Sequence, residues 1–358
     1  MTDARGAKRS GRSHTVKRVR SKLASLRYGS KSHTARLILV TGEYGKTTVV
    51  RLIAKLLQES GHKVVEMVAA EGAGHSIETD PFLLHRRLAN ASRQGYDYVV
   101  LEVHAALIAS QVVPTLSVEM VVATTDSPEL SILAALPVKY LVIPYGVAPP
   151  AGVAHQNIMT VGTDETADMR VVATQLYRKG TEVSLVIDMH TELEVASYLV
   201  GQANASNIAT ALAAVYVLGV DIATFAEGVA RLAHVPGNFE YIAHPAPYLV
   251  AVDRGGPAST LPLLFESAKQ LAKRRLLVAL DAAVEPSILE ELRGHADRIV
   301  MVGESSEPDV ARDHEEAAFI TVRGAKKDDL VLLIGHRYAV YDDDGTLVIA
   351  KTIGGSHE

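Results

Sequence analysis

Continuous apolar runs alternate with amphipathic segments along the first part of the chain. Apolar runs predict strands at 37–41, 63–69, 98–103, 120–123 and 140–143, and spacings of three and four predict helices at 47–60 and 81–94. Uninterrupted Val, Leu and Ile runs are typical of parallel strands that are buried on both faces. The pattern therefore predicts an α/β domain built on a parallel sheet.

The pattern changes over residues 158–200 and then resumes. Short alternating segments predict an antiparallel ribbon at 169–176, 182–188 and 192–199, and a helical pair follows at 204–218 and 222–233. Further strands are predicted at 248–252, 276–280, 298–302 and 330–334, helices at 260–273, 286–293 and 308–317, and a hairpin at 338–350. Pro236-Gly237 separates the two parts, so we expect a central domain over residues 35–235 and a smaller Rossmann-like α/β domain over 236–358.

Composition fits this two-domain picture. A length of 358 residues suits two domains, and a hydrophobic content of 48% is enough for two buried cores. The absence of cysteine excludes disulfides, thiolate metal sites and a cysteine nucleophile. The sequence contains no apolar run of about 18 residues, the length that a transmembrane helix needs. We therefore expect a cytoplasmic protein.

Charge divides the chain into a basic start and an acidic body. Residues 1–36 hold 11 Lys/Arg and one acid, whereas the rest holds 25 basic and 40 acidic residues, a net charge of −15. We expect residues 1–34 to form a basic, partly disordered tail, with disorder over 1–13 and a short amphipathic helix carrying an apolar stripe of Val16, Val19, Leu23 and Leu26.

The stripe leaves two interpretations open. The helix could contact an anionic surface, either lipid or nucleic acid. It could instead dock on the protein's own acidic body, which we expect more, because an apolar stripe gives the helix a face to bury.

A loop between the first strand and the first helix is the main candidate for chemistry. In Thr41–Thr48, Gly42 and Gly45 let backbone N–H groups converge, Lys46 adds a mobile charge, and the following helix adds its positive end. A polyphosphate fits such a loop, and Thr47 is placed to reach an accompanying Mg²⁺. The alternative is that the Gly-Lys turn only joins the strand to the helix. For phosphates to bind, the carboxylate of Glu43 must turn outward, because it would otherwise repel them.

Glu102 ends an otherwise apolar strand. Ligand sites in parallel sheets lie beyond the carboxyl ends of the strands. Glu102 is therefore a candidate metal ligand near Lys46 and Thr47, although an acid at a strand end is more often a solvated residue.

Five separated stretches carry recognisable motifs: Thr41–Thr48, Gly95–Val103, Leu199–Asn207, Val235–Glu240 and Val252-Asp253. In that order they resemble T-G-T-N-G-K-T-T, G-x-D-Y-V-V-M-E-V, L-x-G-x-x-N-x-x-N, V-P-G-R-M-E and the start of V-D-Y-A-H-T-P. Through these motifs the chain resembles the Mur ligases, closest to the UDP-N-acetylmuramoyl-tripeptide synthetase branch.

The resemblance implies an ATP-dependent ligase that joins a carboxylate to an amine through an acyl phosphate. It implies catalytic roles for Lys46 and Glu102, phosphate binding by Gly42, Gly45, Lys46 and Thr48, and Mg²⁺ binding by Thr47 and Glu102. It also implies adenine contacts from Asn204 and Asn207 and a ribose contact from Asp253. The substrates implied are an acidic small-molecule or peptide-like acceptor and an amino acid.

The chain also departs from that family's pattern. A short basic segment stands where the family has its UDP-sugar-binding domain, His104-Ala105-Ala106 replaces S-S-H, and Ser127 replaces a metal-binding His. No carbamoylated lysine can be placed, and residues 303–308 replace the D-N-P-R that selects the amino acid. Two functions therefore remain open: an active ligase with altered acceptor specificity, or a degenerate pseudoenzyme that binds nucleotide or acts as a scaffold.

Overall fold

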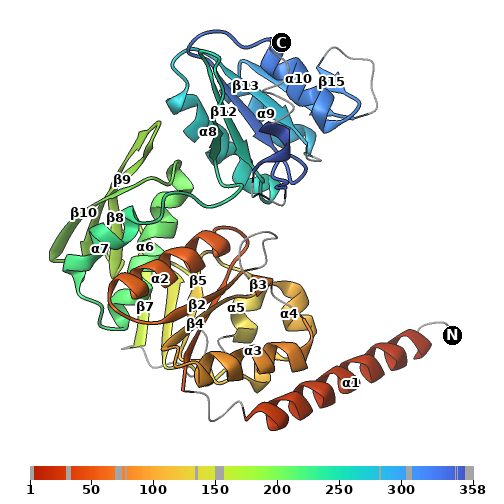
Figure 1. Ribbon diagram of the computed structural model, residues 1–358, viewed down its shortest axis with the longest axis vertical. Helices are drawn as coiled ribbons and strands as arrows, with labels where there is room; N and C mark the ends of the chain where they lie inside the picture. The colour runs from red at the N-terminus through yellow and green to blue at the C-terminus, as the bar shows by residue number, and fades with distance from the viewer. Residues whose placement is uncertain are drawn as a thin grey trace. The chain divides into compact units, whose positions relative to one another are not determined.

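The chain divides into two compact units (Figure 1). The computed structural model describes residues 4–29, 34–68, 75–76, 79–133, 136–149, 157–281, 284–303, 309–342, 344 and 346–350, with the backbone alone for 4–14 and 75–76. Unit 1 comprises Met1–Val172, Ser184–Val195 and Ser206–Arg231, and unit 2 comprises Ala173–Val183, Ala196–Ala205 and Leu232–Glu358.

Unit 1 is organised around a parallel sheet with β1 at its centre. Its strands are β1 (Arg36–Thr41), β2 (Val64–Val68), β3 (His75–Ser76), β4 (Tyr98–Glu102), β5 (Met120–Ala123), β6 (Tyr140–Pro144) and β7 (Ile158–Gly162). They lie in the order β7-β6-β5-β1-β4-β2-β3, and every neighbouring pair is parallel. The predicted parallel sheet is confirmed.

A ribbon continues this sheet beyond β7. Strands β8 (Met169–Tyr177), β9 (Gly180–Ile187) and β10 (Thr191–Ser197) follow in chain order. The turns between them are only a few residues long, and such short connections join antiparallel strands. The antiparallel ribbon expected from the alternating pattern is therefore present, and the division into units passes through it.

Helices cover both faces of the unit 1 sheet. They are α2 (Lys46–Glu59), α3 (Pro81–Arg93), α4 (Ala105–Ala109), α5 (Pro128–Leu133), α6 (Gln202–Val217) and α7 (Phe225–Ala230), with 3₁₀ turns at Val113–Thr115 and Ile222–Thr224. One core joins Leu39 and Leu101 of the sheet to Leu84 of α3. On α2, Leu52, Ile53, Leu56 and Leu57 are fully buried, as the spacing of apolar residues predicts.

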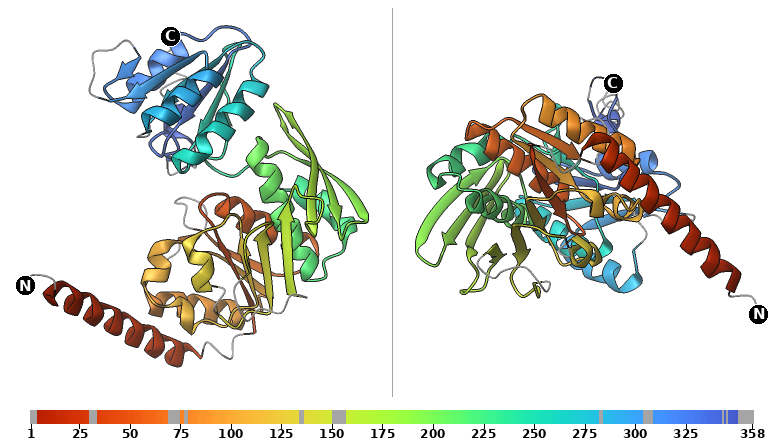
Figure 2. Two further views of the ribbon diagram at one scale, coloured as in Figure 1. Left: turned by 180° about the vertical axis from the view of Figure 1, so that it is seen from behind. Right: turned by 90° about the horizontal axis from the view of Figure 1, so that it is seen from below.

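The basic segment forms one long helix, α1 (Ala4–Tyr28), which begins inside the region expected to be disordered. It lies against α3 (Figure 2). Within residues 15–29, whose side chains the structure describes, Ser21 and Ala24 are buried, whereas the apolar stripe is exposed. Docking on the protein's own body is thus observed, but through the face opposite to the one that the stripe predicted.

Unit 2 holds a second, smaller sheet. Its strands are β11 (Glu240–Ile242), β12 (Leu249–Asp253), β13 (Leu276–Leu280), β14 (Arg298–Val302), β15 (Val310–Ala311) and β16 (Leu330–Ile334). They lie in the order β11-β12-β16-β13-β14-β15, and only β11 is antiparallel to its neighbour. Helices α8 (Leu261–Leu271), α9 (Pro286–His295) and α10 (His314–Arg323) and a 3₁₀ turn at Ala258–Thr260 complete the unit.

Two cores sandwich this sheet, which confirms the predicted second α/β architecture. Val250 and Leu333 face one core with Ala317 of α10, and Val278 and Leu332 face the other with Phe265 of α8. Such alternation along each strand buries both faces of the sheet.

Two local predictions in unit 2 differ from the structure. The helix expected at 308–317 begins only at His314, because Asp313 caps it by accepting a hydrogen bond from Glu316 N at 2.8 Å. Among the described residues of the hairpin expected at 338–350, one antiparallel bridge joins Tyr341 to Leu347, and residues 348–350 are helical. The 304–308 part of the segment that replaces D-N-P-R, and Gly345 at the hairpin tip, lie outside the described residues.

Among the described helices, none combines the length and the apolar character that crossing a bilayer requires.

Candidate phosphate-binding site

The loop between β1 and α2 has the backbone shape that its glycines predict. Gly42 has φ +133° and Gly45 has φ +77°, values that other residues rarely adopt. Lys46 starts α2, and its Nζ donates to the carbonyl oxygens of Gly42 at 2.7 Å and Glu43 at 3.1 Å. The Glu43 side chain is exposed, so its carboxylate does turn outward. The loop thus presents a lysine and a helix N-terminus at one place.

Thr47 and Glu102 come together beside this loop. The register pairs Val40 of β1 with Glu102 of β4, and Thr47 Oγ1 donates to Glu102 Oε2 at 2.8 Å. Glu102 is only 5% exposed. A hydroxyl and a carboxylate at hydrogen-bond distance supply the oxygen ligands that Mg²⁺ prefers.

Two threonines after β5 brace the loop from its other side. Thr124 Oγ1 donates to the carbonyl oxygens of Thr41, at 3.2 Å, and of Tyr44, while Glu43 N donates to Thr125 Oγ1 at 2.7 Å. A Cβ on Gly42 would lie 2.1 Å from Thr124 Oγ1. Sequence reasoning missed these contacts, although Thr124-Thr125 ends a strand next to β1, the position from which a side chain can reach the loop.

Unpaired polar atoms also gather at this edge of the sheet. Among the described residues, Thr41 Oγ1, His104 Nδ1 and Ser127 Oγ are buried without a hydrogen-bond partner. They follow or end β1, β4 and β5, the three central strands. Buried polar atoms are normally hydrogen-bonded, so their clustering favours a polar ligand here.

The residues at this site fit a Mg²⁺ ion that is also bound by waters and phosphates better than a metal ion bound by protein ligands alone. The part of the chain that the structure describes has no group of three His, Cys, Asp or Glu side chains that could hold a metal ion. Mg²⁺ usually takes one or two protein ligands and completes its shell with waters and phosphates. Thr47 and Glu102 suffice for that arrangement.

The two asparagines assigned to adenine lie in different units. Asn207 belongs to unit 1, where its Oδ1 lies 2.2 Å from the position that a Cβ on Gly45 would take. Asn204 belongs to unit 2, where its Nδ2 donates to Val200 O at 2.8 Å. Asn207 is therefore packed directly on the phosphate-binding loop.

Asp253 is held by backbone groups of unit 2. Its Oδ2 accepts from Phe239 N at 3.0 Å and its Oδ1 from Gly255 N at 2.8 Å. Burial raises the pKa of its carboxyl, and these two hydrogen bonds act against that rise. In the structure Asp253 orders the segments on either side of β12.

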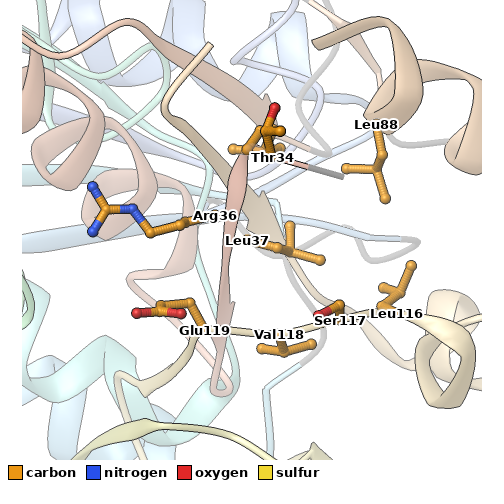
Figure 3. Close-up of a pocket in the computed structure, with 10 residues that line it drawn as sticks. Thr34, Arg36, Leu37, Leu88, Leu116, Ser117, Val118 and Glu119 are labelled. Atoms are coloured by element: carbon orange, nitrogen blue, oxygen red, sulfur yellow. The ribbon is translucent and has the colours of Figure 1, made fainter. Parts of the chain in front are cut away.

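A separate cavity of about 130 Å³ lies at the other end of the unit 1 strands, where the strands begin (Figure 3). The cavity lies where β1 and β5 begin. Leu37 and Leu88 line one side of it, and the side chains of Arg36 and Glu119 point to the other side of the strands. Because it lies at the amino ends of the strands, it is not part of the phosphate-binding site.

Comparison with known proteins agrees with this geometry. Residues 40–129 match the Mur ligase middle domain. The UDP-N-acetylmuramoyl-L-alanyl-D-glutamate–2,6-diaminopimelate ligase of Halalkalibacterium halodurans is 24% identical over 380 residues, which cover 91% of this chain and 78% of that protein.

Solved structures show the same fold. The MurF ligase of Thermotoga maritima in complex with ADP has a TM-score of 0.68 at 18% identity, covering 88% of this chain and 79% of that one. Folylpolyglutamate synthetase of Lactobacillus casei has a TM-score of 0.69 at 16% identity, covering 89% and 92%. The resemblance predicted from the sequence is confirmed: residues 40–129 match the Mur ligase middle domain, and the fold around them is shared with solved Mur ligase structures.

Proposed function

We propose that this protein is an ATP-dependent ligase that joins an acidic acceptor to an amino acid through an amide bond. The observation that carries the proposal is the contact of Thr47 with Glu102 beside the Lys46 loop, inside the segment that matches a Mur ligase middle domain. The named relative performs a ligation of this class, and a fold neighbour holds ADP.

In this proposal the loop binds the phosphates of ATP. The backbone N–H groups at Gly42, Gly45 and Thr48 and the start of α2 face the phosphate oxygens. Lys46 exchanges its carbonyl partners for the phosphates, and Thr47 and Glu102 hold Mg²⁺. The bound metal would neutralise charge on the β- and γ-phosphates, while the protein contributes mainly position and electrostatic stabilisation.

The reaction transfers the γ-phosphoryl group to a carboxylate oxygen of the acceptor. This step releases ADP and leaves an acyl phosphate, whose carbonyl carbon the amine of the amino acid then attacks. The new C–N bond forms as the C–O bond to phosphate breaks, and the amine loses a proton. Asn204 and Asn207 contact adenine in this assignment, and Asp253 contacts the ribose.

The substrates are proposed by class. We infer a peptide-like or small-molecule acid as acceptor, since the relatives extend a UDP-linked peptide. The amino acid differs from theirs, because residues 303–308 replace the D-N-P-R segment and Arg254-Gly255-Gly256-Pro257 replaces Y-A-H-T. We expect the reaction to take place in the cytoplasm, where ATP is available.

One observation favours the alternative of a nucleotide-binding protein without turnover. Ser127 stands where the family has a metal-binding His, and its hydroxyl is buried without a partner among the described residues. Loss of a metal ligand reduces charge neutralisation in the transition state more than it reduces nucleotide binding.

ADP formation separates the two functions. The full-length protein is incubated with Mg-ATP, a set of acidic peptides and the common amino acids, and ADP is measured with each substrate alone and with both. ADP that appears only when acid and amine are both present supports the ligase. Nucleotide binding without ADP supports the degenerate protein, and ADP that needs only the acid indicates a kinase.

Variants assign the site in the same assay. Glu102→Gln should remove ADP formation while Lys55→Ala, on the same helix as Lys46, should leave it unchanged. Lys55 pairs only with Glu59 at 3.2 Å among the ion pairs found in the described residues, away from the loop. Equal activities of the two variants would overturn the assignment of Glu102.

A further inference from the structure

Helix α1 docks on unit 1 through a narrow face of small and polar residues. Ser21 and Ala24 are fully buried, and Ser21 Oγ donates to Ser110 O at 3.3 Å. Arg20 forms an ion pair with Asp80, the N-cap residue of α3, at 2.7 Å. These contacts fix which side of α1 faces the protein.

The apolar stripe lies on the other side of the helix. Because successive helical residues turn by about 100°, the middle of the stripe lies about 150° from the line through Ser21 and Ala24. The exposed fractions of Val16, Val19, Leu23 and Leu26 are 59%, 52%, 53% and 80%. Four apolar side chains along one side of α1 thus face away from the body.

Basic side chains flank the stripe on both sides. The same helical geometry places Arg18 and Lys22 along one edge and Arg27 along the other, and all three are exposed. Residues 15–28 contain no acidic residue, in contrast to a body of net charge −15 over residues 37–358. The outward side of α1 is therefore an apolar and cationic surface on an acidic protein.

From this geometry we propose that α1 binds the surface of a membrane that contains anionic lipids. The apolar stripe enters the region between the headgroups, and Arg18, Lys22 and Arg27 lie at the level of the lipid phosphates. A helix with an apolar face and cationic edges is the pattern of helices that lie in the membrane interface. The docked face holds the rest of the protein on the side of the helix that faces away from the membrane, and this role does not depend on the proposed ligase activity.

The other occupants fit the surface less well. Nucleic acid is bound chiefly through cations on its phosphates and needs no apolar stripe. A second copy of α1 on the same face would bring Arg18, Lys22 and Arg27 against their equivalents, and like charges repel. An anionic lipid surface matches both the charge and the apolar residues.

Vesicle binding by the full-length protein tests the proposal. Partition is measured by sedimentation with vesicles of phosphatidylcholine and phosphatidylglycerol in equal amounts, and with phosphatidylcholine alone. We expect binding to the anionic vesicles only, weaker at high salt. Leu23→Asp/Leu26→Asp should lower the partition at least about tenfold, because each leucine loses its apolar burial. The melting temperature of this double variant should equal that of the unchanged protein, since both side chains are exposed.

A charge pair supplies the matched control. Lys22→Glu and Lys327→Glu change the net charge equally, and both lysines are exposed, but only Lys22 lies beside the stripe. Lys22→Glu should weaken vesicle binding several-fold more than Lys327→Glu. Equal effects of the two, absence of binding by the unchanged protein, or full binding by the double aspartate variant would each overturn the proposal.

Two further outcomes would reassign the surface. If sedimentation velocity without lipid shows a dimer that Leu23→Asp/Leu26→Asp separates, the stripe is an interface between copies and the lipid proposal fails. If the protein binds a single-stranded oligonucleotide equally well with and without those two changes, and does not bind vesicles, the helix binds nucleic acid through charge alone.

Discussion

Replacing Gly45 by alanine should damage the phosphate-binding loop in two separable ways. At φ +77° a residue with a Cβ is strained by about 1–2 kcal/mol. The new Cβ would also lie 2.2 Å from Asn207 Oδ1, far inside contact distance. The buried Asn207 side chain must therefore move, at a further cost of about 1 kcal/mol or more.

Gly61 provides the matched control at the other end of the same helix. It has φ +86°, and a Cβ there meets nothing within 4 Å. Gly61→Ala should therefore introduce only backbone strain, which lowers the unfolding free energy by about 1–2 kcal/mol. Gly45→Ala should lose about 2–4 kcal/mol and at least about tenfold in ATP affinity.

Urea unfolding and calorimetric titration with Mg-ATP measure the two effects. In the double variant Gly45→Ala/Asn207→Ala the collision is absent, so its loss of stability should be smaller than the sum of the single losses. Equal stability losses for Gly45→Ala and Gly61→Ala, together with unchanged ATP affinity in both, would refute the idea that Asn207 packs on the loop to shape it.

Other changes test separate parts of the structure. Lys46→Ala should abolish Mg-ATP binding with little loss of stability, because its Nζ bonds only to two loop carbonyls among the described contacts, and an unchanged dissociation constant in titration would contradict the nucleotide site. Thr124→Val keeps the side-chain volume but removes the hydroxyl that braces the loop, so unfolding free energy should fall by about 1–3 kcal/mol and ATP affinity should fall with it; loss of neither would show that the brace is dispensable. Burial acts to raise the pKa of Asp329, but the hydrogen bonds from Arg275 and the Lys326 N–H outweigh it and hold that pKa below its usual value. The ionised carboxylate therefore stabilises the fold above the unfolded pKa of about 3.9, and this stabilisation is lost as pH falls through the lower pKa of the folded state. In urea unfolding, Asp329→Asn should lower the unfolding free energy by about 3 kcal/mol at pH 7 and by less below pH 4. A loss of unfolding free energy that does not vary with pH would refute this.

Local patterns predicted most elements because each rests on nearest neighbours along the chain. The strands at 276–280, 298–302 and 330–334 agree with β13, β14 and β16 to the residue. Short continuous apolar runs between turn residues are typical of parallel strands in the interior of an α/β sheet. The start of α10 was missed although Asp313 caps the helix by accepting from Glu316 N, and Glu316 Oε2 accepts from Arg312 N at 2.8 Å.

The candidate site shows where a linear pattern stops being informative. Gly42, Gly45 and Lys46 could be recognised because a phosphate-binding loop is a contiguous motif. The braces from Thr124 and Thr125 could not, because they act over 80 residues or more of sequence and depend on β5 lying beside β1.

The sequence by itself determined two α/β units, the phosphate-binding loop and the apolar stripe of a basic helix. The tertiary structure alone decided which face of that helix is buried. Small residues such as Ser21 and Ala24 allow α1 to approach closely and leave no hydrophobic signal, whereas Leu23 and Leu26 give a strong signal and stay exposed. Periodicity reports that a helix has an apolar side; only the shape and hydrogen bonds of the surface it meets decide whether that side turns toward the protein or away from it.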